Sequence, residues 1–75
     1  MIDKGEQYLI DLGFRQVRVR LHGDIARIEL EPKDFDRFMK EDIRKSVYKK
    51  FKEIGFTYVA LDILGYRTGS MNEGL

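Results

Sequence analysis

The chain has 75 residues, which is enough for one domain. Its 14 basic and 13 acidic residues leave a formal net charge of +1, so we expect no overall attraction to nucleic acid or to a membrane surface. The sequence has no cysteine, which excludes disulfides, thiolate metal sites and a thiol nucleophile. Because no apolar run approaches the ~18 residues of a membrane helix, the default expectation is a cytoplasmic protein.

The N-terminal half predicts a helix followed by a β-hairpin. Residues 2–12 carry apolar side chains at helical spacing, and Gly13 follows as a stop signal. From residue 16 the period changes to two, so residues 16–22 predict a strand that is buried on one face. After the turn signal Gly23-Asp24, residues 26–31 alternate in the same way and complete the hairpin.

The C-terminal half predicts a helix and a third strand. Pro32 ends the second strand, and Asp34 is placed to cap a short turn. A longer helix is expected from about Glu41 until Gly55, with one apolar stripe formed by Ile43, Val47, Phe51 and Ile54. A strand should follow from Phe56 to about Leu64. We therefore expect a single α+β domain over residues 1–67 and a flexible C-terminal tail over residues 68–75.

The element order α-β-β-α-β predicts a three-stranded, mainly antiparallel sheet with helices packed on one face. A crossover from the second strand through the long helix favours the strand order 2-1-3, in which the outer strands are parallel to each other. A simple meander, with the order 1-2-3, is the alternative. The covered face is expected to carry Val17, Val19, Leu21, Ala26, Ile28, Leu30, Val59, Leu61 and Ile63.

The uncovered face of this sheet is rich in arginine. The strand period places Arg18 and Arg20 on it, and Arg67 follows the third strand closely enough to reach the same edge. The ordinary interpretation is a solvated surface with cross-strand ion pairs. However, guanidinium groups match phosphate bidentately, and i, i+2 spacing sets two of them about 6.5–7 Å apart. We therefore identify Arg18, Arg20 and Arg67 as candidate phosphate- or substrate-binding residues.

Other combinations of residues are weaker signals. Glu29, Glu31 and Asp62 have the oxygen ligands that a hard cation prefers, but neutralising the neighbouring arginines is their simpler role. His22 is the sole histidine, next to a turn, so a catalytic triad would need a partner chain. No Walker loop, dinucleotide fingerprint or HExxH motif occurs. We assign no catalytic residue and no defined metal site to the chain.

The residue patterns resemble the C-terminal region of the LarE-like family of PP-loop, ATP-dependent sacrificial sulfur transferases. The resemblance covers nearly the whole chain, from residues 6–9 to Glu73. Its most specific motifs are VRVR at 17–20, ARIE at 26–29 and GYRTGSMNE at 65–73, in this order.

The resemblance implies a function for the parent family that this chain cannot perform alone. Family members carry a PP-loop domain with a Ser-Gly-Gly-x-Asp-Ser loop, use ATP and Mg, and typically donate sulfur from a cysteine on the route to the nickel-pincer nucleotide. This chain has neither that loop nor a cysteine. It therefore looks like an accessory domain that binds no cofactor alone. Its expected partners are a PP-loop catalytic domain and further copies of itself.

By the family's motifs, Arg18, Arg20 and Arg67 would carry the anion contacts. The matching acidic residues, Glu6 and Glu29, are implied as candidate cation ligands. A non-catalytic interaction module, which recruits partners through its charged sheet face and strand edges, is the alternative function. RNA binding ranks last, because such sheets present exposed aromatics and Tyr58 alone is expected there. We therefore expect no nucleic-acid partner and no membrane partner.

Overall fold

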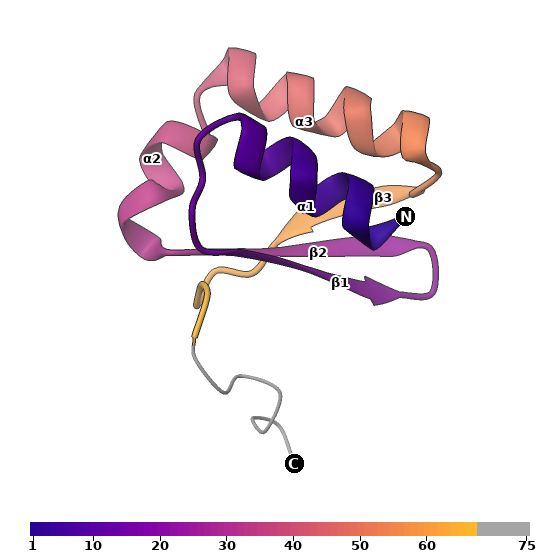
Figure 1. Ribbon diagram of the computed structural model, residues 1–75, viewed down its shortest axis with the longest axis horizontal. Helices are drawn as coiled ribbons and strands as arrows, with labels where there is room; N and C mark the ends of the chain where they lie inside the picture. Colours follow the sequence, from indigo (N-terminus) through magenta and orange to yellow (C-terminus); the bar gives the residue numbers. More distant parts are fainter. Residues whose placement is uncertain (68–75) are drawn as a thin grey trace.

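The computed structural model describes residues 1–67, which form three helices and a three-stranded sheet in the predicted α+β class. The elements are α1 (Ile2–Asp11), β1 (Val17–His22), β2 (Ile25–Leu30), a 3₁₀ turn η1 (Pro32–Asp34), α2 (Phe35–Phe38), α3 (Glu41–Ile54) and β3 (Tyr58–Leu61). Both α1 and α3 pack on one face of the sheet (Figure 1), as the sequence predicts. The predicted flexible tail, 68–75, lies outside the described residues.

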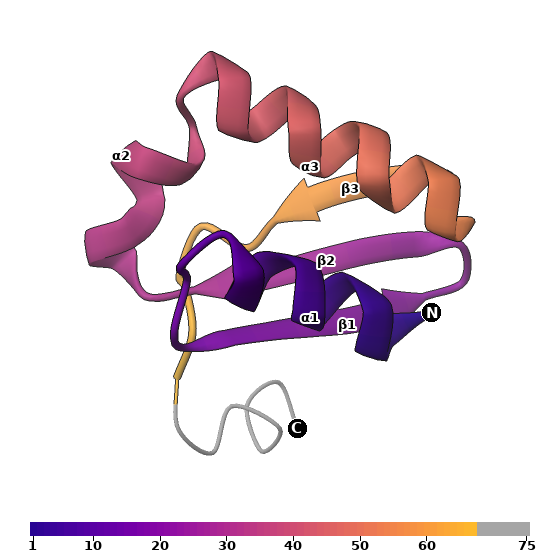
Figure 2. The same ribbon diagram turned by 45° about the horizontal axis from the view of Figure 1, so that its top comes forward.

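The strand order is β1-β2-β3, so the favoured order 2-1-3 is wrong and the alternative order is correct. β1 and β2 form the expected antiparallel hairpin, with Val17 opposite Leu30 and His22 opposite Ile25. β3 is parallel to β2, as the crossover argument required, but it lies beside β2 rather than beside β1. The sheet is therefore mixed. Figure 2 shows how the helices are arranged over this sheet: α1 lies over the β1 side, and α3 lies over the β3 side.

The core lies between the sheet and the helices and is built around aromatic rings. Phe51 of α3 is fully buried, and its ring stacks on Phe56 with 5.6 Å between centroids. Phe14, which follows α1, meets Phe38 of α2 edge-on at 5.7 Å. Gly5 lets α1 approach this core closely, because a Cβ atom there would lie 2.8 Å from the Phe51 ring. The predicted stripe on α3 is confirmed, with Val47 and Phe51 buried and Ile43 and Ile54 packed against the core.

Two members of the predicted core face are exposed instead. Ile63 is 88% exposed because β3 ends at Leu61, so the strand is shorter than the expected run to Leu64. A turn follows, in which the Leu64 N–H donates to the Asp62 carboxylate at 2.9 Å. Leu21 is 46% exposed because it lies near the hairpin end of β1. Within the described residues, no helix is long and apolar enough to cross a membrane.

Candidate functional site

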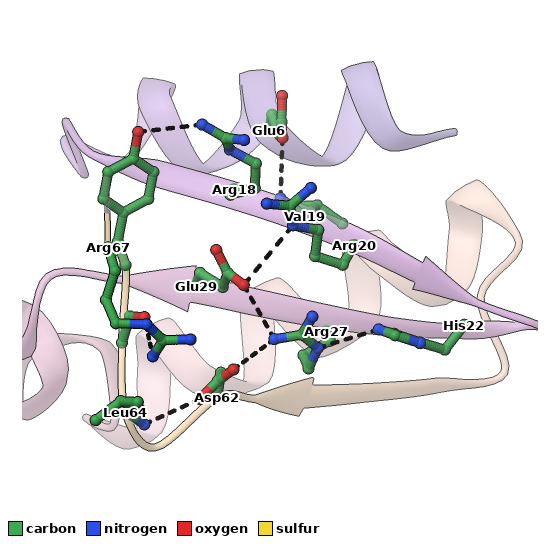
Figure 3. A network of polar contacts seen from close by, with 12 residues as sticks. Glu6, Arg18, Val19, Arg20, His22, Arg27, Glu29, Asp62, Leu64 and Arg67 are labelled. Atoms are coloured by element: carbon green, nitrogen blue, oxygen red, sulfur yellow. Dashed lines mark hydrogen bonds and ion pairs between the residues drawn. The ribbon is translucent and has the colours of Figure 1, made fainter. Parts of the chain in front are cut away.

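The face of the sheet opposite the helices carries a connected group of charged side chains, which we call the arginine face. Arg18 and Arg20 come from β1, Arg27 and Glu29 come from β2, and Asp62 follows β3 (Figure 3). The alternation of strand side chains places all of these groups on one side, because the neighbours Val19 and Ile28 point into the core. The predicted arginine-rich face is therefore present in the fold.

Glu29 is the buried centre of the arginine face. Its side chain is only 2% exposed, although it lies on the face without helices. The Glu29 carboxylate accepts a 3.0 Å hydrogen bond from the Arg27 guanidinium, and the Arg20 Nε atom lies 3.7 Å from the same oxygen. A buried carboxylate is stable when cations and hydrogen bonds compensate its lost hydration. Here two arginines from neighbouring strands supply that compensation.

Arg27 connects this centre to both ends of the face. Besides Glu29, its guanidinium donates to the Asp62 carboxylate, and its Nε atom donates to His22 Nε2 at 3.1 Å. The His22 Nε2 atom accepts this bond through its lone pair. His22 thus supports an arginine, and among the described residues no nucleophile lies in hydrogen-bond contact with it.

Asp62 is held as an anion by the turn after β3. The Leu64 N–H bond lowers the pKa of this carboxyl from its usual 3.8, and the Arg27 and Arg67 guanidinium groups lower it further, against an opposing effect of partial burial. Asp62 is therefore a permanent counter-charge at neutral pH, and it neutralises arginine rather than binding a proton.

Arg18 differs from the other arginines because its recorded partner is neutral. Its guanidinium donates to the Tyr66 hydroxyl at 3.2 Å and lies 5.4 Å from the centre of that ring. Among residues 1–67, no carboxylate lies within ion-pair distance of Arg18. Gly65 positions the tyrosine, because its φ of 93° and its close approach to the Leu30 carbonyl leave no space for a Cβ atom. The Tyr66 N–H then bonds to that carbonyl.

The third predicted arginine, Arg67, also lies on this side of the sheet (Figure 3). Its guanidinium donates to the Gly65 carbonyl at 3.1 Å and acts electrostatically on Asp62. The structure therefore brings Arg18, Arg20 and Arg67 to one face. Among the described groups drawn there, four guanidinium groups lie near the carboxylates of Glu29 and Asp62.

The two candidate cation ligands do not meet. Glu6 extends from α1 to the outer edge of β1, where its carboxylate accepts a 2.9 Å hydrogen bond from the Val19 N–H. Figure 3 shows it on the far side of β1 from Glu29, which is committed to Arg20 and Arg27. In the part of the chain that the structure describes, no three histidine or acidic side chains gather as metal ligands would.

Sequence reasoning missed Tyr66 as a member of the face and missed the central role of Arg27. Tyr66 was assigned no role, because its contact with Arg18 joins residues 48 positions apart through an irregular turn. The strand period is consistent with Arg27 on this face, but its role as the shared partner of Glu29, Asp62 and His22 depends on the β2–β3 pairing. The glycine in the segment Gly65-Tyr66-Arg67 was the available signal, since glycine adopts the positive φ that many turns require.

Comparison with known proteins shows what the chain as a whole is similar to. No family model matches the chain. It is 39% identical to an uncharacterized protein, slr1717, of Synechocystis sp., over 99% of the chain and 28% of that protein. It is 47% identical to pyridinium-3,5-bisthiocarboxylic acid mononucleotide synthase of Lactiplantibacillus plantarum, over 93% of the chain and 25% of the synthase. The similarity to the LarE-like sulfur transferases is thereby confirmed.

The share of each relative that the chain matches shows that the similarity is to one part of a longer protein. The chain spans only about a quarter of the length of the curated relatives it matches. The matched portion corresponds to the whole described fold, and its size fits one accessory domain of a LarE-like protein. The activity of the full synthase depends on a much longer polypeptide.

Proposed function

We propose that this chain is the accessory domain of a LarE-like, ATP-dependent sulfur transferase, and that its arginine face contributes contacts to a phosphate group of the substrate. The similarity of almost the whole chain to a quarter of the synthase supports the accessory role. On this proposal, a PP-loop domain supplies ATP, Mg and the sulfur chemistry, in the same polypeptide or in a partner. The accessory domain also contributes contacts to an oligomer.

The single observation that carries the phosphate role is the state of Arg18. Arg20 and Arg27 already compensate Glu29, whereas Arg18 is held in place by the neutral Tyr66 hydroxyl and ring. A guanidinium oriented without a carboxylate partner keeps its charge and its remaining N–H donors for an incoming anion. Arg20 lies two residues along the same strand, at a spacing that suits a diphosphate or a phosphate with a second anionic group.

The test is a titration of the chain with pyrophosphate, followed by amide and guanidinium NMR shifts at low ionic strength. One isolated domain supplies part of a site, so we expect a dissociation constant of about 1 mM, which corresponds to about 4 kcal/mol. Shifts should centre on Arg18, Arg20 and Tyr66 and should shrink when salt is added. Arg18→Lys combined with Arg20→Lys keeps both charges but removes the planar donors, and it should abolish the localised shifts.

A matched control replaces two exposed arginines outside the face, Arg15→Lys with Arg44→Lys, and should leave the titration unchanged. If the shifts instead follow the lysines of α3, or spread evenly over all basic residues, the arginine face is an ordinary solvated surface. The proposed phosphate role would then be wrong, while the similarity to the synthase would stand.

A further inference from the structure

The two edges of the sheet differ in how their backbone groups are used. At the β1 edge, the Glu6 carboxylate accepts a hydrogen bond from the Val19 N–H, so a side chain of α1 already occupies this position. β3 forms the other edge and, among residues 1–67, pairs only with β2. Unpaired strand edges bind extended chains unless a protein covers or charges them.

The register of β3 identifies the groups that face outward. Leu61 is the register partner of Ile28, and the Asp62 N–H donates to the Ile28 carbonyl at 2.9 Å. Backbone groups of successive residues in a strand point alternately to the two sides. The N–H and C=O groups of Val59 and Leu61 therefore face away from β2, toward the open edge.

An apolar groove lies directly beside these backbone groups, and we call it the β3 groove. It has a volume of about 310 Å³, and its apolar lining includes Phe38, Val47, Val59 and Leu61. Two large side chains in its lining, Met39 and Tyr48, are about half exposed. If a strand were added to β3, every second side chain of that strand would lie on the groove side of the sheet, because alternate side chains share one face. Those side chains would bury the apolar surfaces of the groove.

The charge of the β3 groove selects the occupant. Arg44 and Lys45 belong to its lining, and no carboxylate does. Lys45 is paired with Glu41 at 2.7 Å, whereas Arg44 has no ion pair with any described residue. An occupant that combines apolar side chains with a carboxylate is therefore complementary in both respects.

We infer that the β3 edge is a docking site for an extended segment of a partner polypeptide. The segment adds a fourth strand beside β3, directs apolar side chains into the β3 groove and places a carboxylate near Arg44. A second copy of this chain fits less well. Two-fold pairing of β3 with itself sets both α3 helices on the same side of the joined sheet, so that Arg44 and Lys45 of both copies share one groove and repel.

The experiment uses the isotope-labelled full chain and an acetylated peptide of about eight residues, which has valine at three alternate positions, glutamate at the fourth position of the same face and threonine at the positions between them. The same peptide with lysine in place of glutamate is the charge-matched opposite. With the acidic peptide, amide shifts should centre on Val59, Leu61 and Tyr48 and should spare Val19 at the other edge. The Val59 and Leu61 amides should also become protected from hydrogen exchange, because strand addition bonds them.

Two variants separate the groove from general electrostatics. Arg44→Glu should weaken binding of the acidic peptide by about tenfold and strengthen binding of the basic one. Arg15→Glu makes the same change at an exposed site before β1, and it should change either affinity by less than about threefold. Both positions are exposed, so both variants should fold.

Three results would overturn the inference. Equal affinity for the acidic and basic peptides would show that Arg44 does not select an acidic occupant. Shifts without exchange protection of Val59 and Leu61 would mean contact by side chains alone. Shifts of the same amides with protein concentration, in the absence of peptide, would assign the edge to a second copy. None of these results depends on phosphate binding by the arginine face.

Discussion

Arg20 and Arg27 are direct register partners across the β1–β2 ladder, so two positive charges face each other on the sheet. Like charges in this position destabilise a strand pair. Glu29 resolves the conflict, because one of its carboxylate oxygens lies 3.7 Å from Arg20 and 3.0 Å from Arg27. The facing arginines of the arginine face are thus stable only together with the Glu29 carboxylate.

We therefore expect Glu29→Gln to lower the free energy of unfolding by about 1–3 kcal/mol, because it keeps the shape but leaves two arginines without their shared counter-charge. Urea denaturation at neutral pH measures the change. Glu53→Gln, at an exposed position of α3, is the matched control and should change stability by less than about 0.5 kcal/mol. Equal effects of the two substitutions would mean that the buried carboxylate contributes nothing.

The lowered pKa of Asp62 predicts a pH dependence of stability. Because its folded pKa lies below the ordinary 3.8, the contribution of its carboxylate is fully present above about pH 5. It is lost as the pH falls through the folded pKa. Between about pH 6 and pH 3, the unmodified chain should therefore lose more stability than Asp62→Asn does. Asp36→Asn, at an exposed site on α2, should follow the unmodified chain. Parallel curves for all three proteins would contradict the prediction.

The contact between Gly5 and Phe51 makes an unusual prediction for a helical glycine. Alanine normally stabilises a helix interior by about 0.5–1 kcal/mol relative to glycine. Here its Cβ atom would lie 2.8 Å from the ring of Phe51, which is fully buried and stacked on Phe56. We expect Gly5→Ala to destabilise the fold by about 1–2 kcal/mol.

A double-mutant cycle tests the cause. In a Phe51→Leu background the clash is removed, so Gly5→Ala should be neutral or stabilising there when unfolding is measured with urea. A stabilising effect of Gly5→Ala in the unmodified chain would show that α1 can move away from α3 at little cost.

A further prediction is that the isolated chain has no catalytic activity. We expect the purified chain to hydrolyse no ATP or pyrophosphate and to transfer no sulfur, because it lacks the Ser-Gly-Gly-x-Asp-Ser loop and has no cysteine. Phosphate release over hours, compared with a no-protein blank, measures this. A turnover that Arg20→Ala abolishes would place an active site on the arginine face and refute the accessory role.

The sequence alone was sufficient for the hairpin, for the buried stripe of α3 and for the family resemblance. Strict alternation in residues 16–22 and 26–31 predicted the hairpin, and the spacing from Ile43 to Ile54 predicted the buried stripe of α3. These patterns repeat over short distances, so burial of one face of each element determines them. The motifs VRVR, ARIE and GYRTGSMNE identified the LarE-like resemblance because they are specific runs of residues.

Only the tertiary structure decided which elements are neighbours. Both strand orders satisfy the same burial pattern, and the choice of β2 as the partner of β3 depends on how α1 and α3 divide the sheet between them. That choice brings Asp62 to Arg27, places Tyr66 against Arg18 and, within residues 1–67, leaves β3 as an edge strand. Contacts between residues tens of positions apart leave no periodic trace in a sequence, because the free energy that selects them comes from packing of the whole domain.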